Sequence, residues 1–369
     1  MSIFDEYTRQ LEIKHYDADP VQEKVVQDLS NLQIKLKQHL ADSNSLQYKF
    51  KHLLSIADKP PRGIYLWGDV GRGKTWLMDM FFETLTEQSG FTNQKLRLHF
   101  HHFMRAIHDQ LSLIGEQKNP LKVIARTYAK RYKLLCLDEF HVSDITDAML
   151  LYGLLDTLFK EGITVVATSN IPPDELYKNG LQRERFLPAI KLINENMSTL
   201  VLNGSVDHRL RLLEKADTWY ISSKTQDSTL ENRILEMTTS PAKRHQKIDI
   251  NYRLIDTLLH TNDIIWLDFH VICGDQRGSA DYIEIACQYH TVLLSNIPKM
   301  DDSLNDKCKR FINMIDEYYD RNVNLLASAE TQPEDLYTGK QLEFEFKRTV
   351  SRLLEMRSHE YMQQAHKSS

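Results

Sequence analysis

The hydrophobic residues near the start of the chain have the spacing of a helix. Apolar side chains recur at intervals of four, three and four residues, at Val25, Leu29, Leu32 and Leu36. This is the period of one buried face of an α-helix. Asp19 and Pro20 precede the run, and an N-cap side chain followed by proline is typical of a helix start. The pattern predicts an amphipathic helix of about 20 residues at the beginning of the fold.

Short apolar runs then alternate with helical patterns. The runs lie at residues 64–67, 96–100, 134–137 and 164–168, and one of the intervening helices is expected at 144–159. The run at 134–137 is apolar at every position, as in a parallel strand that is buried on both faces. Strands that alternate with helices in this way predict an α/β fold, with a parallel sheet covered by helices on both sides.

The second half of the chain begins with a change to charged and polar residues. Residues 206–262 include a stretch rich in serine and threonine, and we predict a small polar lid or connector there. A strand-like apolar run resumes at 264–272. The expected division is an N-terminal helical segment at 1–58, an α/β core at 59–205, the lid at 206–262 and a C-terminal α/β region at 263–369.

The C-terminal region contains an echo of the core. In the core, LCLD (residues 135–138) leads through a helix and a strand to PDELY (173–177). In the C-terminal region, LLSN (293–296) leads through a helix and a strand to PEDLY (333–337). Two interpretations stay open. Either the C-terminal region is a degenerate repeat of the core, or any two α/β units share this order of elements.

Composition and charge narrow the class of protein. Hydrophobic residues make up 41% of the 369, enough for a core in each of two or three domains. The four cysteines form no CxxC pair, so we expect neither a disulfide framework nor a zinc ribbon, and a cytoplasmic location. No apolar run approaches the roughly 18 residues of a membrane span. The net charge of −5 argues against nucleic acid as a specific partner, because nucleic-acid binding usually shows a basic excess. The first residues, MSIFDEY, lack the apolar segment of a secretory signal.

One glycine-rich segment carries the strongest chemical signal. Residues 68–75 read GDVGRGKT and match the GxxxxGK[ST] pattern of a P-loop, or Walker A motif, between an expected strand and an expected helix. The glycines let backbone N–H groups surround a phosphate at the N-terminus of the helix. Lys74 would reach the β- and γ-phosphates of ATP, and Thr75 would supply a hydroxyl to Mg²⁺. The residues predicted to bind nucleotide are Gly68, Asp69, Val70, Gly71, Arg72, Gly73, Lys74, Thr75 and Trp76.

Polar residues at two further strand ends would supply the parts for hydrolysis. Asp138 and Glu139 follow the run at 134–137. Asp138 can hold the Mg²⁺ shell, and Glu139 can act as general base on the attacking water. Asn170 follows the run at 164–168 and would orient that water, because the carboxyl ends of neighbouring parallel strands meet at one edge of a sheet. The plainer interpretations are a helix N-cap for the two acids and a turn for Asn170.

Two arginines, Arg183 and Arg185, lie just before Pro188. A planar guanidinium at the edge of such a domain suits an arginine finger, which enters the site of a neighbouring subunit and stabilises charge on the γ-phosphate. The alternative is a surface ion pair with Glu184 or Glu175. A finger would make activity depend on a homo-oligomer.

Two other groups of residues leave their role open. A histidine cluster comprises His99, His101, His102 and His108. It suggests a metal site, but no cysteine or acidic partner has suitable spacing, so a structural or nucleotide-coupling role is preferred. The candidate lid arginines that would sense the γ-phosphate are Arg209, Arg211 and Arg352, and the sequence does not choose among them.

At these residues the chain resembles the AAA+ ATPases, and more narrowly the ZapE cell-division ATPases and their mitochondrial AFG-type relatives. The segments that carry the narrower resemblance are PPRGIYLWGDVGRGKTWLMDMFF, HFHHFMRAIH, LLCLDEFHVSDITDAMLLYGLL, TSNIPPDELYKNGLQRERFLPAI, SADYIEIACQYHTVLLSNIP and RTVSRLLEMRSHEY. They run from Pro60 to Tyr361, and residues 221–247 match no segment of the family. The family's nucleotide residues carry over onto Gly68, Gly71, Gly73, Lys74, Thr75, Asp138, Glu139 and Asn170.

The resemblance implies an ATP- and Mg²⁺-dependent hydrolase that remodels a protein partner. For the bacterial members it implies a cytoplasmic protein that associates with FtsZ or another protein of the division ring. Recruitment to the septum, or to the inner face of the membrane as a peripheral protein, is implied with it. For the mitochondrial relatives it implies protein quality control at the inner membrane. An ATP-switched adaptor with little turnover in such a role is the alternative function.

Overall fold

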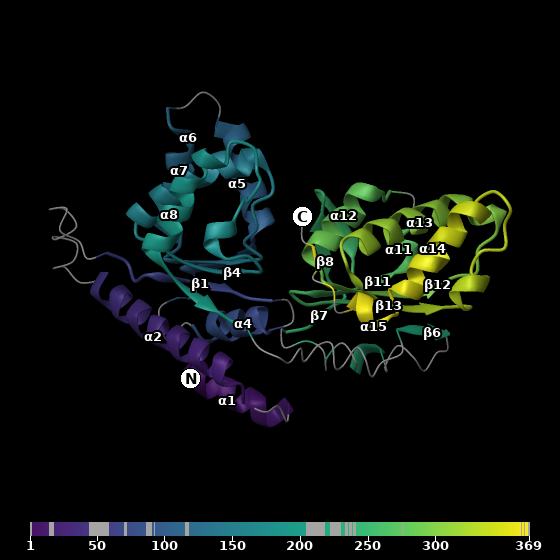
Figure 1. The fold of residues 1–369 in the computed structure, drawn as a ribbon, viewed down its shortest axis with the longest axis horizontal. Coiled ribbons are helices and arrows are strands. Elements are labelled where there is room, and N and C mark those ends of the chain that lie inside the picture. The colour runs from purple at the N-terminus through teal and green to yellow at the C-terminus, as the bar shows by residue number, and fades with distance from the viewer. Residues whose placement is uncertain are drawn as a thin grey trace. The chain divides into compact units, whose positions relative to one another are not determined.

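The computed structural model divides the chain into two compact units, Met1–Val206 and Asp207–Ser369. They are called the first and the second unit below (Figure 1). The residues that the structure describes are 2–14, 18–43, 59–69, 72–85, 91, 93–114, 118–203, 218–221, 230–232, 235, 238, 241–274, 276–362, 364 and 366–367.

The first unit is built on a parallel sheet of five strands with the order β2-β3-β4-β1-β5. Its main elements are α1 (Ile3–Lys14), α2 (Pro20–Ser43), β1 (Gly63–Trp67), α4 (Lys74–Thr84), β2 (Lys95–His99), α5 (Phe100–Ile114), α6 (Pro120–Arg131), β3 (Leu134–Asp138), α7 (Ile145–Lys160), β4 (Thr164–Ser169), η2 (Pro173–Glu175), η3 (Arg183–Arg185), α8 (Leu187–Asn196) and β5 (Met197–Val201). The four predicted strands and the predicted helix at 144–159 are confirmed within a residue or two.

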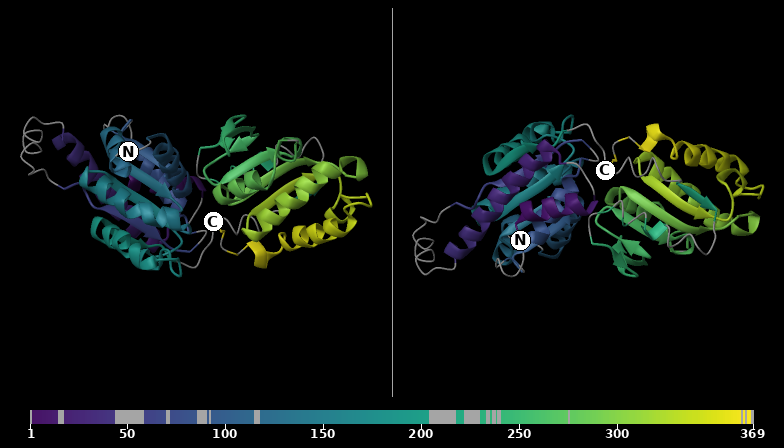
Figure 2. Two further views of the ribbon diagram at one scale, coloured as in Figure 1. Left: turned by 90° about the horizontal axis from the view of Figure 1, so that it is seen from above. Right: turned by 90° about the horizontal axis from the view of Figure 1, so that it is seen from below.

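Both faces of the three central strands of this sheet, β3, β4 and β1, are buried, as their continuous apolar runs indicate. Successive side chains of a strand point to opposite faces. Leu135 and Leu137 of β3 pack with α5, α6, α7 and α8, whereas Leu134 and Cys136 pack in a second core with α1, α2 and α4. Figures 1 and 2 show the two helical layers on either side of the sheet. The prediction of a doubly covered α/β sheet is confirmed.

The N-terminal helices belong to this unit. Helix α2 starts as predicted, since Oδ1 of Asp19 accepts hydrogen bonds from the N–H groups of Val21 and Gln22 at 2.8 and 3.4 Å. The four apolar residues of its predicted face are all buried, in the same core as α4. The rings of Tyr7 on α1 and Trp76 on α4 lie 5.6 Å apart. The two described helices of the predicted N-terminal segment therefore pack directly on the helix that follows the glycine-rich loop.

Helix α7 offers a test of how its start is held. Oδ1 of Asp144, the N-cap residue, accepts hydrogen bonds from the N–H groups of Thr146 and Asp147 at 2.6 and 3.2 Å. Burial opposes ionisation, but these hydrogen bonds outweigh it and lower the pKa of Asp144. We expect Asp144→Ala to cost about 1 kcal/mol, a fall of about 2–4 °C in the melting temperature of the first unit measured by calorimetry.

The control variant is Asp144→Asn, because asparagine is an equally good N-cap. It should keep most of the stability. Because the folded-state pKa of Asp144 is lowered, its ionic contribution is present above the unfolded-state pKa and is lost as the pH falls through the folded-state value. Equal melting temperatures for Asp144→Ala and wild type at neutral pH would contradict this account of the helix start.

The second unit has a mixed sheet of the order β6-β13-β12-β11-β10-β7 and a separate β8-β9 hairpin. Strands β6, β13, β12 and β11 are parallel. Strand β10 pairs antiparallel with β11, and β7 pairs antiparallel with β10. Its elements are β6 (Trp219–Ile221), β7 (Lys243–Arg244), β8 (Lys247–Ile250), β9 (Arg253–Asp256), β10 (Leu259–His260), β11 (Ile264–Asp268), α11 (Phe269–Ile272), α12 (Ser279–Gln288), β12 (Thr291–Ile297), η4 (Asp302–Leu304), α13 (Asn305–Asp320), β13 (Asn324–Ala329), η5 (Pro333–Asp335), α14 (Glu343–Glu355) and α15 (His359–Met362).

Two features of the second unit differ from the sequence interpretation. Strands β6, β7 and β10 come from the range 206–262, so the described part of the predicted lid contributes strands to the second sheet. The strand expected at 264–272 ends at Asp268, where a helix begins. It ends there because Oδ1 of Asp268 caps the new helix by accepting a hydrogen bond from the N–H of His270 at 2.8 Å.

The two sheets share a four-strand pattern. The order β2-β3-β4-β1 in the first unit corresponds to β11-β12-β13-β6 in the second, all parallel. In both, a long helix joins the second and third of these strands, α7 in one case and α13 in the other. A short 3₁₀ helix then leads to a longer α-helix, α8 or α14. This agreement favours the interpretation that the C-terminal region is a degenerate repeat of the core over the interpretation that any two α/β units share this order of elements.

The agreement extends to the turns after the second strand. By the paired residues of the strands, Glu139 corresponds to Asn296 and Thr168 corresponds to Ser328. Glu139 and Asn296 have φ angles of 52° and 61°. The N–H of Glu139 donates to Oγ1 of Thr168 at 3.2 Å, and the N–H of Asn296 donates to Oγ of Ser328 at 3.3 Å. The aligned segments LCLD and LLSN place Asn296 opposite Asp138, whereas the strand registers match it with Glu139, one position further on.

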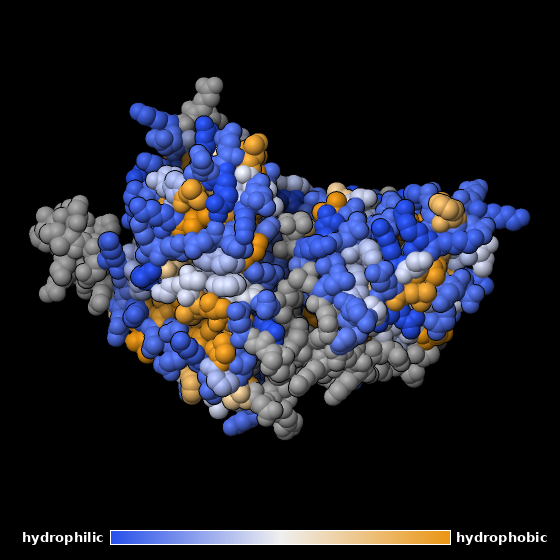
Figure 3. Space-filling view, in the orientation of Figure 1, coloured by the Kyte–Doolittle hydropathy of each residue, from blue (hydrophilic) through white to orange (hydrophobic). Residues whose placement is uncertain are grey.

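The described surface in view is mostly polar. Figure 3 shows hydrophobic residues there in small separate groups. Among the described residues, no helix combines the length and the apolar character that a membrane crossing requires.

Candidate nucleotide-binding site

The carboxyl ends of four strands bring most of the predicted site residues to one edge of the first sheet. In the strand registers, His99 pairs with Asp138, Leu137 pairs with Ala167, and Trp67 pairs with Ser169. The residues that follow these strand ends include Gly68, Glu139 and Asn170. The predicted neighbourhood of the β3 and β4 ends is therefore present. Val70 and Gly71 of the predicted set lie outside the described residues.

Two glycines shape the start of the loop and its end. The N–H of Gly68 donates to the carbonyl of Ser169 at 3.2 Å, and a Cβ at Gly68 would lie 2.2 Å from the carbonyl oxygen of Leu202. Gly73 is the N-cap residue of α4 and has a φ of 84°. No described side chain makes a capping hydrogen bond at this helix start. The first N–H groups of an uncapped helix start, together with the helix dipole, favour an anion.

Lys74 is buried at the first position of α4. Its Nζ donates to the carbonyl oxygens of Gly68 and Asp69 at 2.8 and 2.7 Å, so the ammonium lies against the loop. Thr75 follows in the first turn and is partly exposed. Trp76 is buried, and its ring packs with Tyr7 in the core of the unit.

The donors around the loop fit a triphosphate. Nε and Nη1 of Arg72 are buried and have no hydrogen-bond partner among the described residues. Buried donors normally have partners, and an anionic ligand would supply them here. The carbonyl of Arg72 accepts a hydrogen bond from Nε2 of Gln22 at 3.3 Å, which ties α2 to the loop. The Thr75 hydroxyl and the Asp138 carboxylate are hard oxygen ligands of the kind that Mg²⁺ binds.

The acidic pair is held by the neighbouring strand β4. The hydroxyl of Thr168 donates a hydrogen bond to Oδ1 of Asp138 at 3.3 Å. The same hydroxyl oxygen, Oγ1 of Thr168, accepts a hydrogen bond from the N–H of Glu139. The N–H of Phe140 donates to the carbonyl of Thr168 at 2.7 Å. Glu139 has a positive φ, which is unusual for a residue other than glycine and occurs at functional sites that the surroundings hold in place.

Arg97, on β2, is a site residue that the sequence analysis missed. Its Nε donates to Oδ2 of Asp138 at 2.6 Å, and its Nη1 contacts Oδ1 of Asp79 on α4. Burial opposes the charge of the guanidinium, but Asp138 and Asp79 outweigh it and raise the pKa of Arg97. The available signal was an arginine inside the predicted strand at 96–100, where a buried charge requires a partner.

The histidine cluster lies beside Glu139. Nδ1 of His99 is 4.0 Å from Oε2 of Glu139. The rings of His101 and His102 lie 4.1 Å apart, and burial, reinforced by His102 and His99, lowers the pKa of His101 to about 2. Across the described part of the chain, no group of three or more His, Cys, Asp or Glu side chains has metal-binding geometry.

The remaining predicted residues lie on and after β4. Asn170 is exposed directly after this strand. Nη2 of Arg183 donates to the carbonyl of Asp174 at 2.6 Å. Arg185 is exposed, and its side chain makes no hydrogen bond or ion pair within the described ranges. Glu175, one of the suggested ion-pair partners, contacts Lys178 at 2.8 Å instead. Of the two arginines, Arg185 is the one whose guanidinium is available to another chain.

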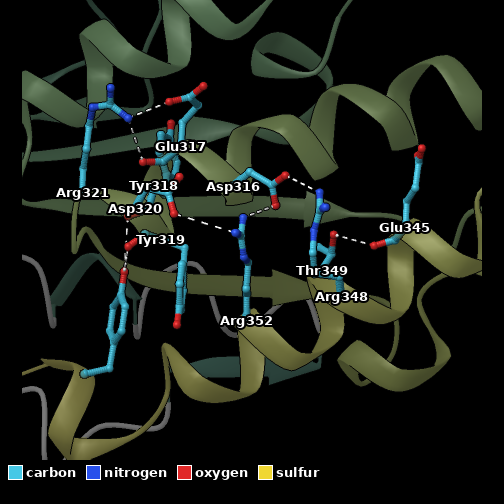
Figure 4. A network of polar contacts seen from close by, with 11 residues as sticks. Asp316, Glu317, Tyr318, Tyr319, Asp320, Arg321, Glu345, Arg348, Thr349 and Arg352 are labelled. Carbon is cyan, nitrogen blue, oxygen red and sulfur yellow. Dashed lines mark hydrogen bonds and ion pairs between the residues drawn. The ribbon is translucent and has the colours of Figure 1, made fainter.

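Of the candidate lid arginines, Arg352 is held within the second unit, and Arg209 and Arg211 lie outside the described residues. Arg352 on α14 contacts Asp316 and Asp320 of α13, the latter at 3.8 Å, and its guanidinium lies 4.8 Å from the ring centre of Tyr319 (Figure 4). Arg348 also contacts Asp316, at 2.6 Å. These contacts give Arg352 a structural role between two helices.

The chain is similar to several known proteins. The AFG1-like ATPase family matches residues 1–365. The cell division protein ZapE of Escherichia coli (strain K12) is 44% identical over 309 residues, which cover 83% of this chain and 81% of that protein. Lactation elevated protein 1 homolog B of Danio rerio is 32% identical over 350 residues, 82% of this chain and 68% of that protein.

Among solved structures, AMPPCP-bound DnaA from Aquifex aeolicus matches with a TM-score of 0.35 and 14% identity, over 60% of this chain and 61% of that one. That likeness is too distant to bear on function. The family match over nearly the whole length carries the assignment: the chain belongs to the AFG1-like ATPases, a family of P-loop AAA+ proteins.

Proposed function

We propose that this protein is a Mg²⁺-dependent ATP hydrolase that couples turnover to the remodelling of a protein partner. The observation that carries the proposal is the placement of Glu139 at the same sheet edge as the Lys74 loop, directly after Asp138. A protein that only bound ATP would need the loop but no general base.

Each residue has a separate task in this account. Lys74 binds the β- and γ-phosphates, and Thr75 and Asp138 would hold Mg²⁺, whose charge neutralises the phosphate oxygens. Glu139 accepts a proton from the attacking water, and Asn170 orients that water. The hydrogen bonds from the Glu139 N–H and to the Asp138 carboxylate, both involving Thr168, fix the two acids relative to β4.

The direct test is phosphate release by the purified full-length protein. We expect release from ATP with Mg²⁺ and none when EDTA removes the metal. Parallel assays with GTP measure whether the site distinguishes the two nucleotides. Absence of release from both nucleotides, with the protein folded and ATP bound, would show that the chain is a binder and not a hydrolase.

We propose that the partner is a protein of the division ring, because the 44% identical relative is named a cell division protein. FtsZ is the first candidate. The experiment is co-sedimentation with FtsZ filaments. Glu139→Gln protein in Mg-ATP should sediment more than the same protein in ADP, and Lys74→Ala should not respond to nucleotide. Mid-cell localisation of a fluorescent fusion tests recruitment to the septum. No co-sedimentation and no mid-cell signal would refute FtsZ-ring association.

We further propose that Arg185 acts on the site of a neighbouring subunit. Arg185→Ala should lower ATP turnover by about tenfold or more. Mixing it with Lys74→Ala should restore part of the activity, because each subunit then supplies what the other lacks. The matched control is Lys191→Ala, which removes an exposed cation paired with Glu195 at 3.8 Å. If mixing restores nothing and Arg185→Ala behaves like Lys191→Ala, the finger assignment is wrong.

A further inference from the structure

We propose that Arg97 is a positioning residue for metal binding, which fixes the orientation of the Asp138 carboxylate that would hold Mg²⁺. The proposal rests on the proposed function, because it assigns a task within the same site. It concerns a residue outside the P-loop and the acidic pair, on a strand that contributes no predicted ligand to the nucleotide.

The first step of the argument is the geometry of the guanidinium. Two nitrogens of Arg97 contact two different carboxylates. Nε lies 2.6 Å from Oδ2 of Asp138, and Nη1 contacts Oδ1 of Asp79. The side chains of Arg97, Asp79 and Asp138 are only 10%, 6% and 4% exposed. A planar fork that is fixed at both ends has little freedom to rotate, so it holds the Asp138 carboxylate in one orientation.

The second step concerns charge. Two carboxylates buried near one another repel, and each loses the stabilisation that water would give it. The single positive charge of Arg97 compensates one of them, so the trio keeps one net negative charge. That charge suits a site that would bind a divalent cation next to a triphosphate.

The third step is the connection that the fork makes. Asp79 lies on α4, the helix that begins at the phosphate loop with Lys74, and Asp138 ends β3. Arg97 therefore links the helix that carries the phosphate-binding lysine to the strand that carries the acidic pair. A change in either element would be transmitted to the other through one side chain.

The second unit provides an internal comparison. By the strand registers, Trp266 of β11 corresponds to Arg97, and Ser295 of β12 corresponds to Asp138. There Nε1 of Trp266 donates to Oγ of Ser295 at 2.5 Å. The contact between the two strands is thus kept, but both charges are absent. The arginine accompanies the acid, as expected if its task is to serve that carboxylate and not merely to join the strands.

The experiment uses the full-length Arg97→Lys variant. Lysine keeps the positive charge but has no fork, so it cannot contact both carboxylates with the same geometry. Binding of N-methylanthraniloyl-ATP is followed by fluorescence anisotropy, first in EDTA and then across a Mg²⁺ titration. We expect nearly unchanged affinity in EDTA, and a rise of about 10–100-fold in the Mg²⁺ concentration that gives half of the gain in affinity.

The matched control is Arg126→Lys, the same change at an exposed pair whose Nε contacts Glu161 at 2.8 Å. It should follow the wild-type Mg²⁺ curve. A second variant, Asp79→Asn, keeps an acceptor for Nη1 while removing one charge, and should shift the Mg²⁺ curve in the same direction by a smaller factor. It serves as the test if Arg97→Lys does not fold.

The outcomes are distinct. A wild-type Mg²⁺ curve for a folded Arg97→Lys, or for Asp79→Asn where Arg97→Lys is unfolded, overturns the proposal. Equal losses of affinity with and without Mg²⁺ also overturn it, because they indicate a structural role only. If the wild-type protein itself binds nucleotide without any response to Mg²⁺ and releases no phosphate, the proposed function has failed before Arg97 is tested.

Discussion

Replacing Lys74 by alanine is expected to lower ATP hydrolysis by about 10³-fold, close to background. The ammonium lies against the loop carbonyls of Gly68 and Asp69, where it can compensate charge on the β- and γ-phosphates. The affinity for Mg-ATP should fall as well, since Lys74 contacts the phosphates of bound ATP already before the transition state. The measurements are phosphate release and anisotropy of a fluorescent ATP analogue.

The control for this variant is Lys160→Ala. It removes the same type of side chain from a surface pair with Asp156 at 2.8 Å, and exposed pairs of this kind contribute little. Lys160→Ala should retain wild-type turnover. Equal rates for Lys74→Ala and wild type would show that the loop is not the site of hydrolysis.

Replacing Glu139 by glutamine is expected to lower turnover by about 10²–10⁴-fold while ATP binding is kept within about twofold of wild type. Glutamine has the shape of glutamate but accepts no proton from the attacking water. The variant should therefore accumulate in the ATP-bound state. Turnover is measured by phosphate release and binding by anisotropy.

The matched control is Glu161→Gln, at an exposed carboxylate that pairs with Arg126. It should hydrolyse ATP at the wild-type rate. A Glu139→Gln protein that turns over ATP normally would contradict the assignment of the general base. A variant that loses binding along with turnover would show that Glu139 supports the fold of the site instead.

Much of the first unit could be predicted from sequence, because its elements are specified locally. The apolar runs of β1, β3 and β4 are buried, and the helix starts at Asp19 and Asp144 show their capping contacts. The glycine loop could also be identified, since Gly68 and Gly73 occupy positions that require glycine. A Cβ at Gly68 would clash with a backbone carbonyl, and Gly73 has a positive φ. These features depend on residues a few positions apart, which a sequence pattern can show.

Features that depend on distant contacts could not be predicted. Arg97 contacts residues 18 and 41 positions away in the sequence, and Gln22 contacts a carbonyl 50 positions away. No local pattern indicates such partners. In the second unit, β6, β7 and β10 are strands of two or three residues. They are too short to show an alternation, so the sequence predicts a lid in their range.

The contacts of Arg352 could not be predicted for the same reason. Its neighbours on α13 are 32 to 36 positions away, and the sequence indicated only a candidate lid arginine. The structure gives that arginine two acidic partners and an aromatic face. Side chains of this kind acquire a role from tertiary packing, and sequence reasoning can name them only as candidates.

The most direct test of the central claim is a single-turnover experiment on the full-length protein. ATP carrying a label that stays with the nucleotide after hydrolysis is bound to excess protein with Mg²⁺. At successive times the bound nucleotide is extracted, and ATP is separated from ADP. The account predicts ADP on the wild-type protein and persistent ATP on Glu139→Gln. Persistent ATP on both proteins would contradict hydrolysis, and ADP on both would contradict the role of Glu139.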